Sequence, residues 1–147
     1  MNTKLPVLAA MVTVLLAAGA CSPALEASAA KDANIEVTID EFTNTQHIAK
    51  QIEIEEGGVL TVSLGSNPTT GFSWAEAAEI ADPTVLQQAE SNFQAPDNKG
   101  VVGASGTQVW TFEALQNGTT VVTMEYGRPW EGGEKGVWTF ELTVTVK

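Results

Sequence analysis

The chain has 147 residues, of which 44% are hydrophobic, and its 18 acidic residues against 7 basic ones give a formal net charge of −11. This length fits one domain with an ordinary hydrophobic core. The acidic balance argues against nucleic acid or anionic lipid as a direct partner of the folded part. It favours solubility and, if the partner is basic, faster association.

The first 20 residues have the pattern of a bacterial lipoprotein signal peptide. Lys4 supplies a short positive region, an apolar stretch follows from Leu5 to Ala20, and small residues precede Cys21. The alternative, a transmembrane anchor, needs about 20 apolar residues, and this stretch is shorter. We therefore expect a signal peptide over 1–20, a lipidated Cys21 with a flexible tether over 21–34, and a folded domain over 35–147.

Cys21 is the only cysteine, so the folded part contains neither a disulfide nor a thiol nucleophile. Lipid on this residue would be the protein's only link to a membrane. Ser22 follows it instead of Asp, which favours the outer membrane over the inner one. We expect the protein in the bacterial cell envelope, lipid-anchored, facing the periplasm or the cell surface.

Residues 35–147 alternate between apolar and polar side chains with a period of two, which is typical of strands. The strand candidates are 35–39, 48–55, 60–64, 72–77, 107–114, 119–126 and 138–146. Gly57-Gly58 is expected to end a strand, and Asn117-Gly118 is a strong hairpin signal. Only 82–90 has helical spacing, with Pro83 in its first turn, and a short helix or 3₁₀ turn is predicted there. The pattern predicts an all-β fold, an immunoglobulin-like antiparallel β-sandwich of seven to eight strands.

Two rigid turn sequences lie between these strands. In the first, Pro68 fixes its own φ and Gly71 can adopt a positive φ, so Thr69 and Thr70 should lie at the tip of a stiff loop. In the second, Pro129 stiffens the step between Arg128 and Trp130. Loops that are already ordered lose little entropy on docking, and they therefore suit a binding surface.

These motifs resemble those of the chagasin-like inhibitors of papain-family cysteine peptidases. That family is marked by an NPTTGF loop, a Gly-rich loop and an RPW loop in that order, and the likeness covers about 35–147. The matching residues are Asn67, Pro68, Thr69, Thr70, Gly71 and Phe72, then Gly103, Ala104, Ser105 and Gly106, then Arg128, Pro129 and Trp130. Many relatives have Gly where Ser105 stands, so a positive φ there would strain the middle loop.

The resemblance implies a reversible inhibitor that occludes the active-site cleft of a papain-family peptidase with its three loops. Thr69 and Thr70 would approach the catalytic cysteine–histidine pair, Trp130 would stack on an aromatic wall, and the Gly-rich loop would clamp one flank. Alternate connections of such a sandwich share an end, so the loops are expected at one tip. We expect a monomer that needs no cofactor.

The sequence also predicts roles for individual aromatic and charged residues. The indole of Trp130 is costly to leave in water, which makes it the candidate hot spot, and Arg128 beside it offers a planar hydrogen-bonding fork. Phe72 is expected to anchor the first loop inward. Three further tryptophans lie inside strand patterns and should pack in the core: Trp74, Trp110 and Trp138.

Two alternative functions are considered. One is an immunoglobulin-like surface adhesion or assembly module that uses the same loops. The other is an acid-dependent hydrolase that uses Glu53 and Glu55, although a solvated acidic face explains those residues more simply. The sole histidine, His47, lies away from every motif, and no metal-ligand spacing occurs. We therefore predict a protein that is not an enzyme and binds no metal.

Overall fold

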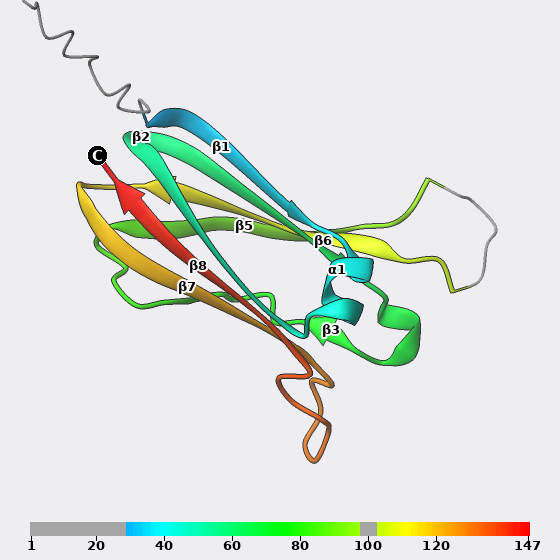
Figure 1. Cartoon of the computed structure of the whole chain (residues 1–147). Helices are drawn as coiled ribbons and strands as arrows, with labels where there is room; N and C mark the ends of the chain where they lie inside the picture. The colour runs from blue at the N-terminus through cyan, green and yellow to red at the C-terminus, as the bar shows by residue number, and fades with distance from the viewer. Residues whose placement is uncertain (1–28, 98–102) are drawn as a thin grey trace, which may run out of the picture.

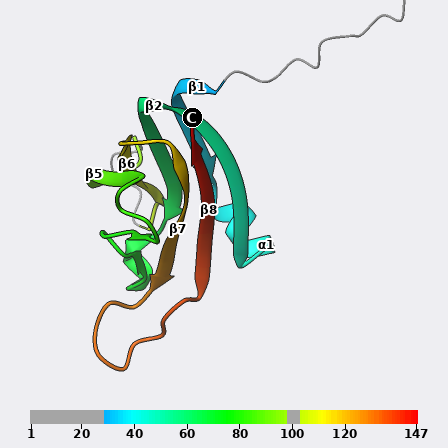
Figure 2. The same ribbon diagram turned by 90° about the vertical axis from the view of Figure 1, so that its left-hand side faces the viewer.

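Alternation of buried and exposed side chains produces a two-layer β-sandwich in the computed structural model, which describes residues 29–97 and 103–147. The predicted signal peptide and Cys21 lie outside these residues. Figure 1 shows the elements, and Figure 2 shows the two layers from the side. The strands are β1 (Ala30–Val37), β2 (His47–Ser66), β3 (Ser73–Trp74), β4 (Glu79–Ile80), β5 (Leu86–Gln94), β6 (Gly106–Ala114), β7 (Gly118–Gly127) and β8 (Trp138–Val146), and the helices are α1 (Ile39–Asn44) and the 3₁₀ turn η1 (Pro68–Thr70). The predicted all-β sandwich of seven to eight strands is confirmed.

Strand β2 belongs to both layers. Its first half, up to Ile54, pairs in parallel with β8, and its second half, from Val59, pairs antiparallel with β6. Strand β1 pairs in parallel with the second half, and its first residue, Ala30, pairs with Ile54. The strand assignment continues through Gly57-Gly58, where the sequence predicted an end, but the chain turns back at these glycines and the two halves of β2 run in opposite directions (Figure 1). Gly57 has a φ of 78°, and a Cβ on Gly58 would lie 1.8 Å from the Lys31 carbonyl oxygen. Only glycine allows this approach of β1.

Of the short helix or 3₁₀ turn predicted over 82–90, the helix is wrong, since Leu86 to Gln94 form β5 and pair with β6. The only turn there runs from Asp82 to Val85, whose N–H donates to the Asp82 carbonyl over 3.2 Å. Ala89 is left out of the register between Gln88 and Glu90. This bulge interrupts the alternation, and the resulting spacing imitates a helix.

Helix α1 follows β1 where the alternation predicted one longer strand over 35–39. Thr38 and Glu41 form a capping box: the Thr38 hydroxyl accepts the Glu41 N–H, and the Glu41 carboxylate accepts the Thr38 N–H at 2.8 Å. The backbone hydrogen bond from Thr38 lowers the pKa of Glu41. Phe42 is the buried residue of this helix. None of the helices among the described residues is long and apolar enough to cross a membrane.

The core lies between the layers. Alternate residues of β6, β7 and β8 point inward, including Phe112, Met124 and Phe140, which are all but inaccessible to solvent. Trp74 and Trp110 are buried as predicted, and Trp138 packs against the core while staying partly exposed. Strand β1 begins at Ala30, so its first residues pair with β2 although the tether was predicted to reach Asn34.

Candidate functional site

Three loops meet at one end of the sandwich, away from the carboxyl terminus (Figure 1). The first, residues 67–72, joins β2 to β3; the Gly-rich loop joins β5 to β6; and the RPW loop, residues 128–137, joins β7 to β8. Asn67 Nδ2 donates to the Gly103 carbonyl oxygen over 3.5 Å, and Gly71 lies against the Trp130 ring. The structure therefore brings residues of all three predicted motifs together.

The first loop is ordered by its own side chains. Pro68 to Thr70 form a single 3₁₀ turn, which ends at Gly71 with a φ of 81°. The Thr69 hydroxyl donates to Asn67 Oδ1 over 2.6 Å, and the Thr70 hydroxyl donates to the Asn67 carbonyl oxygen over 2.8 Å. Both threonine side chains thus stabilise the turn while Pro68 to Thr70 remain exposed. The tip is rigid and carries no charge.

The RPW loop folds back on itself. The Arg128 N–H donates to the Glu134 carbonyl oxygen over 2.7 Å, and the Gly133 N–H donates to the Trp130 carbonyl oxygen over 3.1 Å. With Gly132 at a φ of 74°, residues 130–133 have the hydrogen bond and the positive φ of a type II turn. Trp130 begins this turn, and 52% of its surface is exposed.

Gly71 connects the first loop with the RPW loop. A Cβ on Gly71 would lie 2.9 Å from Cη2 of Trp130, so only a residue without a side chain lets the indole approach this closely. One edge of the Trp130 ring is therefore supported by the first loop, while the rest of the ring faces solvent. An indole fixed in this way is a preorganised contact surface.

Arg128 crosses between the same two loops. Its guanidinium carbon lies 4.5 Å from the centre of the Phe72 ring and 5.8 Å from that of Trp130. A column of stacked rings continues below: Phe72 on Tyr126 at 5.9 Å, Tyr126 on Trp138 at 4.6 Å, and Trp138 on Phe42 of α1 at 5.5 Å. The column ties the RPW loop to the core, and it gives Phe72 the inward position that the sequence predicted.

The planar guanidinium group of Arg128, which was predicted to offer hydrogen bonds to a partner, is only partly accessible. Arg128 is half-buried, and its Nε is enclosed without a hydrogen-bond partner. The guanidinium instead contacts two aromatic faces, an arrangement worth about 0.5–2 kcal/mol. Arg128 thus stabilises the tip from within.

The Gly-rich loop is described at Gly103, Ala104 and Ser105, and it enters β6 at Gly106, while 98–102 lie outside the described residues. Gly103 has a φ of 84°, whereas no described residue other than glycine has a positive φ. Ser105 is therefore not strained. A Cβ on Gly106 would lie 2.3 Å from Cζ of Phe93, which explains glycine at that position.

Sequence reasoning missed Tyr126 as part of the site. Its hydroxyl accepts the Asn67 N–H over 3.1 Å and lies 3.4 Å from the Asn67 carbonyl oxygen, to which it donates. Tyr126 is the last buried residue of β7 before the RPW loop, so it links the bases of two loops. The only feature of the sequence that could have identified Tyr126 as a site residue is its position in a strand pattern, two residues before Arg128.

Nothing in the described residues supports hydrolysis. The His47 ring contacts the hydroxyl of Thr139 at 2.7 Å on the outer face of the sheet, and Glu53 forms an ion pair with Lys147 at 2.8 Å. Glu55 is exposed. Within 29–97 and 103–147, no group of three His, Cys, Asp or Glu side chains could hold a metal ion.

Comparison with known proteins agrees with the motifs. The model of the chagasin family of peptidase inhibitors matches residues 53–144. Chagasin from Trypanosoma cruzi is 33% identical over 88 residues, which are 58% of this chain and 79% of chagasin. Amoebiasin-2 from Entamoeba histolytica is 26% identical over 98 residues, 65% of this chain and 76% of that protein.

Solved structures show the same fold. The cysteine protease inhibitor EhICP2 from Entamoeba histolytica has a TM-score of 0.61 at 22% identity, over 79% of this chain and 97% of that one. PbICP-C, solved in complex with falcipain-2, has a TM-score of 0.55 at 15% identity, over 77% of this chain and 99% of that one. At these identities the likeness establishes the fold.

Proposed function

The chain belongs to the chagasin family of peptidase inhibitors, and from this premise we propose that it inhibits papain-family cysteine peptidases reversibly by inserting its three loops into the active-site cleft. It is an inhibitor of cysteine peptidases and not an enzyme. The observation that supports the loop mechanism is the contact between the first loop and the RPW loop. There Trp130 rests on Gly71 and keeps about half of its surface exposed.

Inhibition follows from occupying the cleft. The uncharged tip formed by Pro68, Thr69 and Thr70 enters next to the catalytic cysteine and histidine of the peptidase. Trp130 stacks on the wall of the cleft, and Gly103 to Gly106 contact one flank. Substrate is excluded because its place is taken, and no covalent bond forms between inhibitor and enzyme.

The rigidity of the first loop explains why the inhibitor is not cleaved. Attack by the catalytic cysteine requires a carbonyl group aligned within about 3–3.5 Å of the nucleophile. In the first loop, the carbonyl oxygens of Asn67 and Pro68 accept hydrogen bonds from the loop itself. Alignment would break these bonds, so the turn blocks the peptidase without serving as its substrate.

We further propose that a signal peptide over 1–20 and lipid on Cys21 direct the inhibitor to the outer membrane of the cell envelope, and that it acts there as a monomer. The geometry of the domain fits such an anchor. Ala30, the first residue of β1, pairs with Ile54, near the carboxyl terminus and away from the loops. A membrane-tethered domain would then present its loops outward. Mass spectrometry of the amino-terminal peptide tests the lipid, with Cys21→Ala as the control that should move to the soluble fraction.

An inhibition titration of the soluble domain, residues 29–147, against papain or cathepsin L tests the proposed activity. Enzyme activity should fall as the inhibitor approaches the enzyme concentration and return on dilution. Full activity at micromolar inhibitor would contradict the proposal. A serine peptidase assayed in parallel should remain active, since the loops are proposed to fit a cysteine-peptidase cleft.

The adhesion alternative is not favoured. Its only support was the presentation of loops by a sandwich, and the family match accounts for those loops as inhibitory elements. The hydrolase alternative is not favoured, because Glu53 forms an ion pair with Lys147 and Glu55 is exposed, which is the solvated acidic face that the sequence suggested.

A further inference from the structure

One side chain donates to the backbone carbonyl groups on both sides of Pro129. Lys135 Nζ donates to the carbonyl oxygen of Arg128 and to that of Trp130, the second over 3.1 Å. The lysine lies in the same loop, five residues after Trp130, so these bonds close the loop on itself. Lys135 is outside the RPW motif, and the resemblance gives it no role.

The Lys135 ammonium is used for these carbonyl groups and not for an ion pair. Glu131 and Glu134 are close in sequence, yet the one ion pair among the described residues joins Glu53 to Lys147. An ammonium group has three donors and no acceptor, and hydrogen bonds from a charged donor are about twice as strong as neutral ones. Two such bonds fix the backbone direction on both sides of Pro129.

We propose that Lys135 is a positioning residue, which holds the Pro129-Trp130 step in its binding conformation before the peptidase is met. This inference rests on the proposed function. If only a fraction of the free inhibitor molecules has the RPW loop in its binding conformation, the apparent dissociation constant equals the intrinsic one divided by that fraction. Lys135 raises the fraction by tying the carbonyl of Trp130, which the Gly133 N–H also binds, to the carbonyl of Arg128.

Binding kinetics of three variants against papain test this role. Lys135→Met keeps the length of the side chain and removes the donors, and it should slow association and weaken binding roughly 3- to 10-fold, the size of one net hydrogen bond. Lys135→Arg restores donors and should recover most of the loss. Lys147→Met removes a lysine at the opposite end and should bind like the parent protein.

Salt distinguishes positioning from electrostatic attraction. If Lys135 acted only as a charge that steers the peptidase, the loss in Lys135→Met would disappear near 1 M salt, where the screening length is about 3 Å. Positioning predicts that the loss persists. Binding by Lys135→Met as tight as that of the parent, or a loss that vanishes in high salt, would overturn the inference.

A second measurement needs no target peptidase. A Glu-specific endopeptidase can cleave after Glu131, which is exposed in the loop and keeps its neighbours in Lys135→Met. The variant should be cut there faster than the parent and faster than Lys147→Met, as followed by mass spectrometry. Equal rates would show that Lys135 does not order the loop. If the parent protein failed to inhibit papain, the proposed function would be wrong, but this cleavage assay would still test whether Lys135 orders the loop.

Discussion

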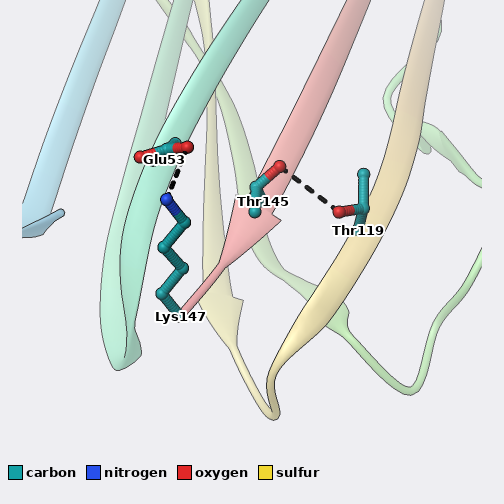
Figure 3. A network of polar contacts seen from close by, with 4 residues as sticks. All are labelled: Glu53, Thr119, Thr145 and Lys147. Atoms are coloured by element: carbon teal, nitrogen blue, oxygen red, sulfur yellow. Dashed lines mark hydrogen bonds and ion pairs between the residues drawn. The ribbon is translucent and has the colours of Figure 1, made fainter. Parts of the chain in front are cut away.

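The two ends of the sandwich are built differently. At the loop end, aromatic rings, glycines and hydrogen bonds between side chains and backbone connect three loops that are far apart in sequence. At the other end, Glu53 pairs with Lys147 at 2.8 Å and the hydroxyls of Thr119 and Thr145 lie 3.3 Å apart, on neighbouring strands (Figure 3). These side chains are exposed, and the ion pair keeps about half of its surface in solvent.

This difference separates the proposed binding surface from the end of the sandwich that has only a structural role. Trp130 remains 52% exposed although its neighbours hold it, whereas Trp110 in the core is fully buried. Exposing an ordered indole is unfavourable unless a partner covers it. At the far end, the hairpin predicted at Asn117-Gly118 is wrong, because the turn there joins β6 to β7, and these strands pair with different neighbours and not with each other. That turn exposes no comparable aromatic surface. The comparison predicts that substitutions at the two ends will affect inhibition and stability separately.

The largest expected effect on inhibition is that of Trp130→Ala. The exposed indole contributes little to the fold and is proposed to form the main apolar contact with the peptidase, so its loss should weaken inhibition by about 2 kcal/mol or more, roughly 30-fold. The thermal midpoint should change little. Inhibition constants against papain and a melting curve measure both quantities. Unchanged affinity would remove the main contact of the proposed mechanism.

Gly71→Ala should follow in size and should affect both properties. A methyl group would lie 2.9 Å from Trp130, and alanine disfavours the φ of 81° found there. The strained backbone should cost about 1–2 kcal/mol of unfolding free energy, and the displaced indole should weaken inhibition about tenfold. Gly103→Ala is a matched control, because its φ is 84° but no atom lies within 4 Å of its Cβ position. If the two variants inhibited equally well, the support of Trp130 by Gly71 would be unimportant.

Tyr126→Phe should have a smaller effect. The substitution keeps the ring in its stack with Trp138 and removes the hydroxyl that bonds to both backbone groups of Asn67. Loss of these hydrogen bonds should lower the unfolding free energy by about 1 kcal/mol, and the loosened first loop should inhibit a few-fold less well. Denaturant unfolding and inhibition titrations are the measurements. Loss of stability with full inhibition would mean that Tyr126 supports only the fold.

The sequence predicted those parts whose local pattern agrees with the final packing. The alternation over 138–146 identified β8 and its buried face because one side of that strand meets the core and the other meets solvent. The rigid loops were predicted for the same reason: Pro68 restricts the backbone and Gly71 permits a positive φ, and the structure has a short turn between them. Whether the predicted contact residues bind a peptidase remains a prediction.

The errors arose where distant packing decided the outcome. Gly57-Gly58 does turn the chain, as its composition indicates (Figure 1), but β1 pairs with β2 on both sides of the turn, so the strand is not interrupted there. The spacing over 82–90 imitates a helix because a bulge at Ala89 shifts the register against β6. The cross-loop contacts of Arg128 and Tyr126 join segments some sixty residues apart in sequence. Local patterns contain no information about such pairs.

The smallest effect is expected at the far end, and it tests the comparison most directly. Glu53→Gln and Lys147→Met each break an ion pair whose side chains are 46% and 57% exposed. Solvent and salt screen such pairs, so each substitution should change the unfolding free energy by less than about 1 kcal/mol and leave the inhibition constant unchanged. A large loss of inhibition would mean that the far end also contacts the peptidase or is coupled to the loops. These substitutions alter charge without contacting any of the three loops. Equal inhibition by both variants and the parent would therefore agree with a binding surface at the end where Trp130 is exposed.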